Sequence, residues 1–180
     1  MYLYIKLLFS VIYFASIHEP VEENRENFTI ALDISGDTTY LFNHKKKFTL
    51  IIFFNSHYCR QCYEDLNILF KKYLNDSLYQ CEMFLENEDN YMQNAYNYRL
   101  VKNYFPNAEV KFRIPALSLD FKATSNDDFF EIYQVKNAPA ILVGRTLNHT
   151  PIKYFSYHDI YDSRGSIKQE FLTALKELII

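Results

Sequence analysis

The chain has 180 residues, of which 49% are hydrophobic and 18% aromatic, enough for one domain with a substantial core but too few for two. Only 3 glycines and 5 prolines argue against a disordered or low-complexity protein. The net charge of −3 offers no basic surface for nucleic acid, and 3 cysteines are too few for a disulfide framework.

Residues 1–17 are typical of a secretory signal peptide. A positive charge at Lys6 precedes a short apolar stretch with a small residue, Ala15, near its end. The stretch is shorter than the roughly 20 apolar residues of a membrane span. A buried first strand is the alternative interpretation. We interpret residues 18–27 as a linker and residues 28–180 as the mature domain.

Three N-x-[S/T] sequons, at Asn27, Asn75 and Asn148, are candidate glycosylation sites. Such short motifs also arise by chance in a chain rich in asparagine. Together with a signal peptide, however, they favour the secretory route.

Three extended segments are predicted before the cysteines, at residues 28–34, 39–42 and 48–54. The third is apolar without alternation, which is typical of a central strand covered on both faces. Residues 44–47 carry several charges, and we expect a solvated loop there.

A helix is predicted after Cys59, because apolar residues recur there at helical spacing. One face of this helix comprises Cys62, Leu66, Leu69, Phe70, Tyr73 and Leu74. Cys62 therefore points inward, whereas Cys59 stays near the surface at the helix N-terminus. A dithiol site needs this difference between an accessible attacking thiol and a buried resolving thiol.

The remaining segments alternate between strand and helix patterns. Strands are predicted at residues 79–84, 110–121, 139–144 and 152–155, and helices at residues 91–105, 126–133 and 166–178. The short middle helix is capped by Ser125 and Asn126, and the last begins with a capping box of Ser166 and Gln169. This order predicts an α/β domain with a mixed sheet between helices.

The chemistry centres on Cys59 and Cys62, because a strand followed by C-x-x-C and a helix is the layout of a thioredoxin-like redox site. A helix N-terminus lowers the pKa of a thiol, and His57 and Arg60 add nearby positive charge. Cys59 would attack a disulfide and Cys62 would displace the product, with no cofactor needed.

Two alternatives for this motif remain open. The cysteines can form a purely structural disulfide, or they can bind zinc together with Cys81 and His57. Because the sequence has no second cysteine pair, we predict no metal. Cys81 is interpreted as a small buried residue or a spare thiol.

A second feature is Ala138-Pro139 ahead of the apolar segment 140–143. In thioredoxin-like folds a cis-proline at the start of a strand faces the dithiol and contacts the substrate chain. The alternative is a trans-proline that simply opens a strand. The combination with C-x-x-C is more specific than either feature alone.

The sequence resembles the lumenal thioredoxin-like domain of the oxidoreductase subunit of eukaryotic oligosaccharyltransferase, whose vertebrate relatives are described as magnesium-transporter-like proteins. The matching blocks are FTLIIFFNSHYCRQCYEDLNILF, ALSLDFKATSNDDFFEIYQVKNAPAILV and YDSRGSIKQEFLTALKEL. The resemblance implies that transient mixed disulfides with nascent polypeptides assist protein N-glycosylation in the lumen of the endoplasmic reticulum. It also implies that Cys59 attacks, that Cys62 resolves and that Ala138 and Pro139 contact the peptide. Tyr58 and Tyr63 are candidates to line a groove.

The sequence departs from that family in two places. Family members continue into four membrane helices, whereas this sequence ends at Ile180, so we expect membrane association only through partner subunits. Residues 78–110 form a longer helical insert, rich in tyrosine and asparagine, after the first active-site helix. Two alternative functions are a free-standing lumenal thiol–disulfide oxidoreductase and a non-catalytic peptide-binding adaptor.

Overall fold

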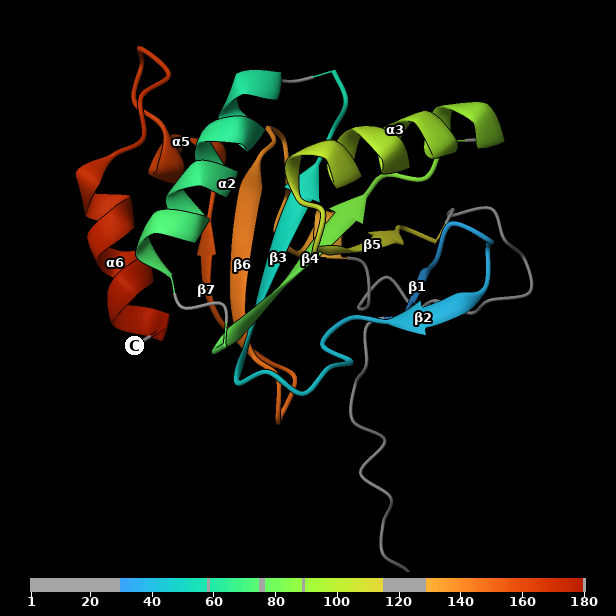
Figure 1. Cartoon of the computed structure of the whole chain (residues 1–180), viewed down its shortest axis with the longest axis horizontal. Coiled ribbons are helices and arrows are strands. Elements are labelled where there is room, and N and C mark those ends of the chain that lie inside the picture. Colours follow the sequence, from blue (N-terminus) through green and yellow to red (C-terminus); the bar gives the residue numbers. More distant parts are fainter. Residues whose placement is uncertain (1–29, 58, 75–76, 89, 115–128, 180) are drawn as a thin grey trace, which may run out of the picture.

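The computed structural model describes residues 30–57, 59–74, 77–88, 90–114 and 129–179, which form one layered α/β domain (Figure 1). Its strands are β1 (Ile30–Leu32), β2 (Thr38–Tyr40), β3 (Phe48–Phe54), β4 (Tyr79–Leu85), β5 (Glu109–Phe112), β6 (Ala140–Arg145) and β7 (Thr150–Phe155). Its helices are α2 (Arg60–Tyr73), α3 (Tyr91–Tyr104), α4 (Phe129–Ile132), α5 (Tyr157–Ile160) and α6 (Gln169–Ile179). The predicted signal peptide, the linker, Asn27, Asn75, Tyr58 and the predicted caps Ser125 and Asn126 lie outside the described residues.

The seven strands form one sheet in the order β2-β1-β5-β4-β3-β6-β7. β4 pairs in parallel with β3 and with β5, while β6 runs antiparallel to β3 and β7 antiparallel to β6. The mixed sheet predicted from the sequence is therefore confirmed. The segment predicted as a helical insert, residues 78–110, contains β4, α3 and the start of β5, so it contributes two strands to the central sheet and α3 connects them.

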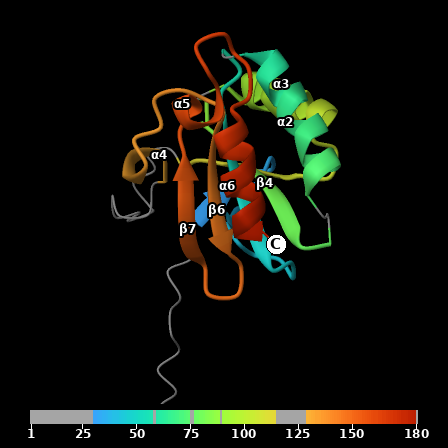
Figure 2. The same cartoon turned by 90° about the vertical axis from the view of Figure 1, so that its left-hand side faces the viewer.

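β3 is the centre of the core, and all seven of its residues are buried. Its alternate side chains enter two separate apolar clusters, one on each face of the sheet. α2, α3 and α6 cover the face that includes Leu50, Ile52 and Phe54 (Figures 1 and 2). α4 and residues 41–42 cover the other face. Burial on both faces explains why this strand lacks alternating polar residues.

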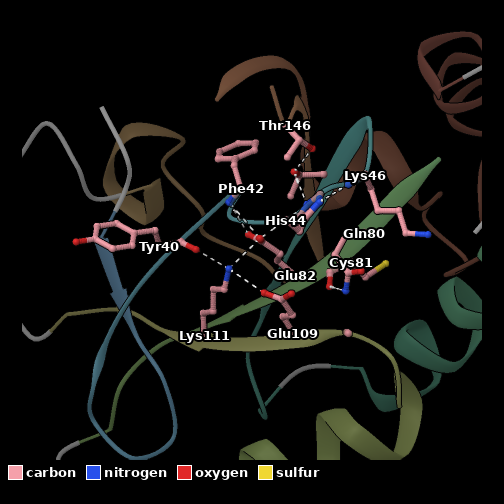
Figure 3. A network of polar contacts seen from close by, with 12 residues as sticks. Tyr40, Phe42, His44, Lys46, Gln80, Cys81, Glu82, Glu109, Lys111 and Thr146 are labelled. Carbon is pink, nitrogen blue, oxygen red and sulfur yellow. Dashed lines mark hydrogen bonds and ion pairs between the residues drawn. The ribbon is translucent and has the colours of Figure 1, made fainter. Parts of the chain in front are cut away.

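A buried ion pair lies on the second face, close to the connection between β2 and β3 (Figure 3). The Nζ atom of Lys111 is 2.8 Å from Oε1 of Glu82, and both side chains are almost fully inaccessible to solvent. The two carboxylate oxygens of Glu82 also accept the backbone N–H of Phe42 at 3.0 and 3.1 Å. The prediction of a solvated loop is wrong for His44, whose side chain is 8% exposed.

Several predicted details differ from the structure. The helical spacing of apolar residues places Tyr73, Tyr91 and Ile132 on buried faces, yet 39%, 68% and 46% of their surfaces are exposed. The expected strand at 110–121 is the shorter β5 within the described residues, and residues 115–121 lie outside them. Amphipathic spacing locates a helix face well, but it does not show where the neighbouring element ends.

The C-terminal helix also begins later than predicted. Ser166 belongs to a turn, where its N–H donates to Oδ1 of Asp162 at 2.9 Å, and α6 starts only at Gln169. A capping box does occur, but Ser156 and Asp159 form it at the start of α5. Within the described residues, no helix has the combined length and apolarity needed to cross a membrane.

Candidate dithiol site

Cys59 and Cys62 lie at the N-terminus of α2 and are joined by a disulfide, with their Cα atoms 5.3 Å apart. Cys59 is the N-cap residue, and its Sγ atom accepts the backbone N–H of Cys62 at 3.2 Å. Cys59 is exposed, whereas only 2% of the Cys62 surface is accessible. The predicted difference in exposure between the two cysteines is confirmed.

Hydrogen bonds of Asn55 stabilise the turn between β3 and α2, which leads to the dithiol. Asn55 donates its backbone N–H to the hydroxyl of Tyr63 at 3.1 Å and accepts the N–H of His57 on its side chain at 2.9 Å. Tyr63 is only 1% exposed, and its ring packs on Phe54 with centroids 4.6 Å apart. Tyr63 therefore holds the turn from inside the core, and the prediction that it lines an open groove does not fit this position.

Two basic residues flank Cys59 in the sequence, His57 and Arg60. His57 and Arg60 are both exposed, as expected from their place in the motif. The guanidinium of Arg60 donates to the hydroxyl of Tyr96 on α3 at 2.7 Å. This contact could not be predicted, because the two residues are 36 positions apart in the sequence.

The peptide bond between Ala138 and Pro139 is cis, as the sequence predicts. β6 pairs with β3 so that Ala140 is opposite Phe53. Pro139, the residue before Ala140, consequently lies beside the C-terminal end of β3, where the chain continues toward Cys59. The register thus brings the cis-proline and the dithiol to the same end of the domain. Ala138 and Pro139 are both buried.

Cys81 lies farther along the strands than the dithiol, toward the opposite end of the sheet. It is half-buried on β4 and opposite Leu50 of β3, four residues before the end of that strand. At about 3.3 Å per residue, this separates it from the end of β3 by roughly 13 Å. Among the described residues, no three His, Cys, Asp or Glu side chains are grouped to hold a metal. The zinc interpretation therefore gains no support.

The folded chain resembles several solved bacterial structures. A thiol-disulfide oxidoreductase from Bacteroides fragilis aligns with a TM-score of 0.54 at 15% identity, covering 84% of this chain and 96% of that one. A thioredoxin-like protein from Porphyromonas gingivalis has a TM-score of 0.54 at 16% identity, with 84% and 89% covered. The exposed lipoprotein thioredoxin of Streptococcus pneumoniae has a TM-score of 0.52 at 16% identity, with 83% and 98% covered.

This chain has a thioredoxin-like fold. At these identities the likeness concerns the fold alone. No family model matches the sequence, and no curated protein does. In this thioredoxin-like domain, the C-x-x-C pair lies where the central strand meets its first long helix, and the cis-proline precedes the adjacent antiparallel strand.

Asn148 is the one sequon asparagine among the described residues. It lies in the turn between β6 and β7, and its side chain is exposed. Its backbone carbonyl accepts the hydroxyl of Thr150 at 3.0 Å. Asn148 is thus accessible, and its glycosylation stays a prediction.

Proposed function

We propose that this protein is a thiol–disulfide oxidoreductase that forms transient mixed disulfides with polypeptides. The observation that carries the proposal is the paired geometry of an exposed Cys59 and a buried Cys62 at the start of α2. Two further features support it: the cis-proline at the same sheet edge, and a fold shared with proteins named as thiol-disulfide oxidoreductases.

In the reducing direction, the Cys59 thiolate attacks one sulfur of a client disulfide. A bond forms between Cys59 and that sulfur, and the other client sulfur leaves as a thiolate. Cys62, deprotonated by solvent, then attacks Cys59, forms the Cys59–Cys62 disulfide and releases the first client sulfur. The client gains two electrons, and the dithiol loses them.

Cys59 is assigned as the attacking residue because of its position on the helix. A thiolate at an N-cap is stabilised by the helix dipole and by free backbone N–H groups. The N–H of Cys62 already donates to the Cys59 sulfur in the oxidised protein. In the oxidised protein only 2% of the Cys62 surface is exposed, so a client sulfur can approach Cys59 but not Cys62. This restriction favours its role as the resolving thiol.

Turnover on a general substrate tests the proposal. The protein should accelerate the reduction of insulin disulfides by dithiothreitol, and Cys59→Ser should abolish the acceleration. Cys81→Ser provides the matched control, since Cys81 lies away from the dithiol and should be dispensable. An unchanged rate in Cys59→Ser would exclude the dithiol as the source of activity.

At a finer level, we propose that the clients are nascent secretory polypeptides and that the protein assists their N-glycosylation as an accessory factor of oligosaccharyltransferase. The three sequence blocks quoted above support this assignment, and the lumen of the endoplasmic reticulum would be its location. Co-purification with the catalytic subunit of the transferase tests it. Failure to associate, together with unchanged glycosylation on deletion, would leave a free-standing oxidoreductase.

A further inference from the structure

Tyr161 connects the C-terminal part of the domain to the dithiol helix. It follows α5, and its hydroxyl donates to the backbone carbonyl of Cys62 at 2.8 Å, although the two residues are 99 positions apart. Only 1% of the Tyr161 surface is exposed. Figures 1 and 2 show α5 at the end of the domain where α2 begins. A buried tyrosine hydroxyl needs such a partner, and here the partner belongs to a predicted redox residue.

The ring of Tyr161 is fixed independently of α2. It stacks on Tyr157 with centroids 5.0 Å apart, and its backbone N–H donates to the carbonyl of Tyr157 at 2.9 Å. The backbone of Tyr161 also forms a β-bridge with Ile167. Burial raises the pKa of the Tyr161 hydroxyl well above its ordinary value, so the group stays protonated and able to donate.

The hydrogen bond is additional to those that form the helix. A carbonyl at the beginning of an α-helix accepts the N–H four residues later, along the helix axis. The bond from Tyr161 reaches the same carbonyl from a residue outside the helix, so it adds a restraint on the peptide group of Cys62. The position of that peptide group decides where the Cys62 sulfur can go.

We propose that Tyr161 is a positioning residue for the resolving step: it holds the backbone of Cys62 so that the Cys62 sulfur remains within reach of Cys59. This inference rests on the proposed function. In the step concerned, the Cys62 thiol loses its proton to solvent and its sulfur bonds to the Cys59 sulfur. The bond between Cys59 and the client sulfur breaks, and the client leaves as a thiolate that regains a proton from solvent.

The proposal predicts a selective kinetic effect. Without the hydroxyl, Cys62 samples more positions, its effective concentration at Cys59 falls, and the mixed disulfide lasts longer. A hydrogen bond of ordinary net strength corresponds to a change of about two- to tenfold. The first attack by Cys59 should be unaffected, because it does not involve Cys62. The Cys59–Cys62 disulfide should also become easier to reduce by the same factor.

The test uses Tyr161→Phe, which keeps the ring and removes only the hydroxyl. The fully reduced protein, with Cys81→Ser in every variant, is mixed with an equimolar amount of 5,5′-dithiobis(2-nitrobenzoate). The first release of thionitrobenzoate reports attack by Cys59, and the second reports resolution by Cys62. Equilibration with dithiothreitol buffers gives the stability of the disulfide. Tyr157→Phe is the matched control, because the hydroxyl of Tyr157 has no hydrogen-bond partner within the described residues.

We expect Tyr161→Phe to slow the second release two- to tenfold with an unchanged first release, and Tyr157→Phe to change neither. If Tyr161→Phe lowers the melting temperature while both releases and the redox equilibrium stay as in the wild type, Tyr161 is only structural and the proposal is wrong. If the wild-type protein shows no release of thionitrobenzoate that depends on Cys59, the proposed function itself is wrong.

Discussion

The backbone N–H of Cys62 donates to the Sγ atom of Cys59 at 3.2 Å, so the sulfur of Cys59 caps the helix that carries its own partner. In the reduced protein, the same N–H would stabilise a thiolate. A cysteine at a helix N-terminus has a pKa below the roughly 8.5 of a free thiol.

Alkylation of reduced Cys59 by iodoacetamide should reach half of its maximal rate at a pH below about 8.5. Cys62 should react much more slowly, because it is buried. Mass spectrometry of the alkylated peptides over a pH series measures both rates. A Cys59 profile centred at or above the value of a free thiol would show that the cap does not activate it.

Lys111→Met should destabilise the domain strongly, by about 3–5 kcal/mol, because it leaves the carboxylate of Glu82 buried without its cation. The change is measured as the free energy of unfolding in urea. Lys72→Met provides the control, since Lys72 is exposed and its loss should cost less than about 0.5 kcal/mol. Equal effects of the two substitutions would mean that the buried pair is not a major source of stability.

Stability should fall as the pH is lowered through the range between 6.5 and about 4, with His44 as one cause. Desolvation by burial lowers the pKa of His44 to about 4, from an ordinary value of 6.5. Between these values the unfolded chain binds a proton that the folded chain does not, so acid favours unfolding. His44→Gln should reduce the slope of stability against pH in this window.

The hydrogen bonds of His44 fit a neutral ring (Figure 3). Its Nδ1 accepts the N–H of Lys46 at 3.1 Å, which leaves the proton on Nε2, 2.9 Å from the hydroxyl of Thr49. Nε2 is also 3.9 Å from Glu82, which would form an ion pair only with a protonated ring. Because the ring is neutral near pH 7, we regard this contact as weak. His158→Gln, at an exposed histidine, is the matched control.

Gly144→Ala should destabilise the domain by about 1–3 kcal/mol through overpacking. A Cβ atom at position 144 would clash with the ring of Phe42, which is buried and packs edge-on against Phe129. Adding Phe42→Leu should relieve the clash, so the double variant should be more stable than the sum of the single effects. If the changes in the free energy of unfolding in urea simply add in the double variant, a clash between position 144 and Phe42 is not the cause of the destabilisation.

The parts of the site that lie close together in the sequence were predictable. The apolar run of β3 and the helical spacing after Cys59 are local patterns, and they correctly separate an exposed Cys59 from a buried Cys62. Ala138-Pro139 could be associated with the dithiol through the resemblance to a known fold. The register of β6 on β3 then brings the cis-proline and the dithiol to the same end of these strands.

Other parts could not be predicted, because they depend on contacts between distant segments. In the sequence, Glu82 and Lys111 look like ordinary charged surface residues. Only the pairing of β4 with β5 brings their side chains together. Tyr63 is buried with a partner for its hydroxyl, the backbone N–H of Asn55, and this contact forms only when the chain folds back from β3 into α2. The hydroxyl of Tyr161 likewise finds Cys62 only in the folded chain.

Covalent trapping tests the central claim most directly. In Cys62→Ser, a mixed disulfide formed by Cys59 cannot be resolved from within the protein, so incubation with insulin should yield an adduct that dithiothreitol releases. Cys81→Ser should be present throughout, and the variant that also carries Cys59→Ser should form no adduct. Accumulation of the adduct through Cys59 alone is the predicted result. No adduct in Cys62→Ser, or an equal amount without Cys59, would contradict a redox role for this dithiol.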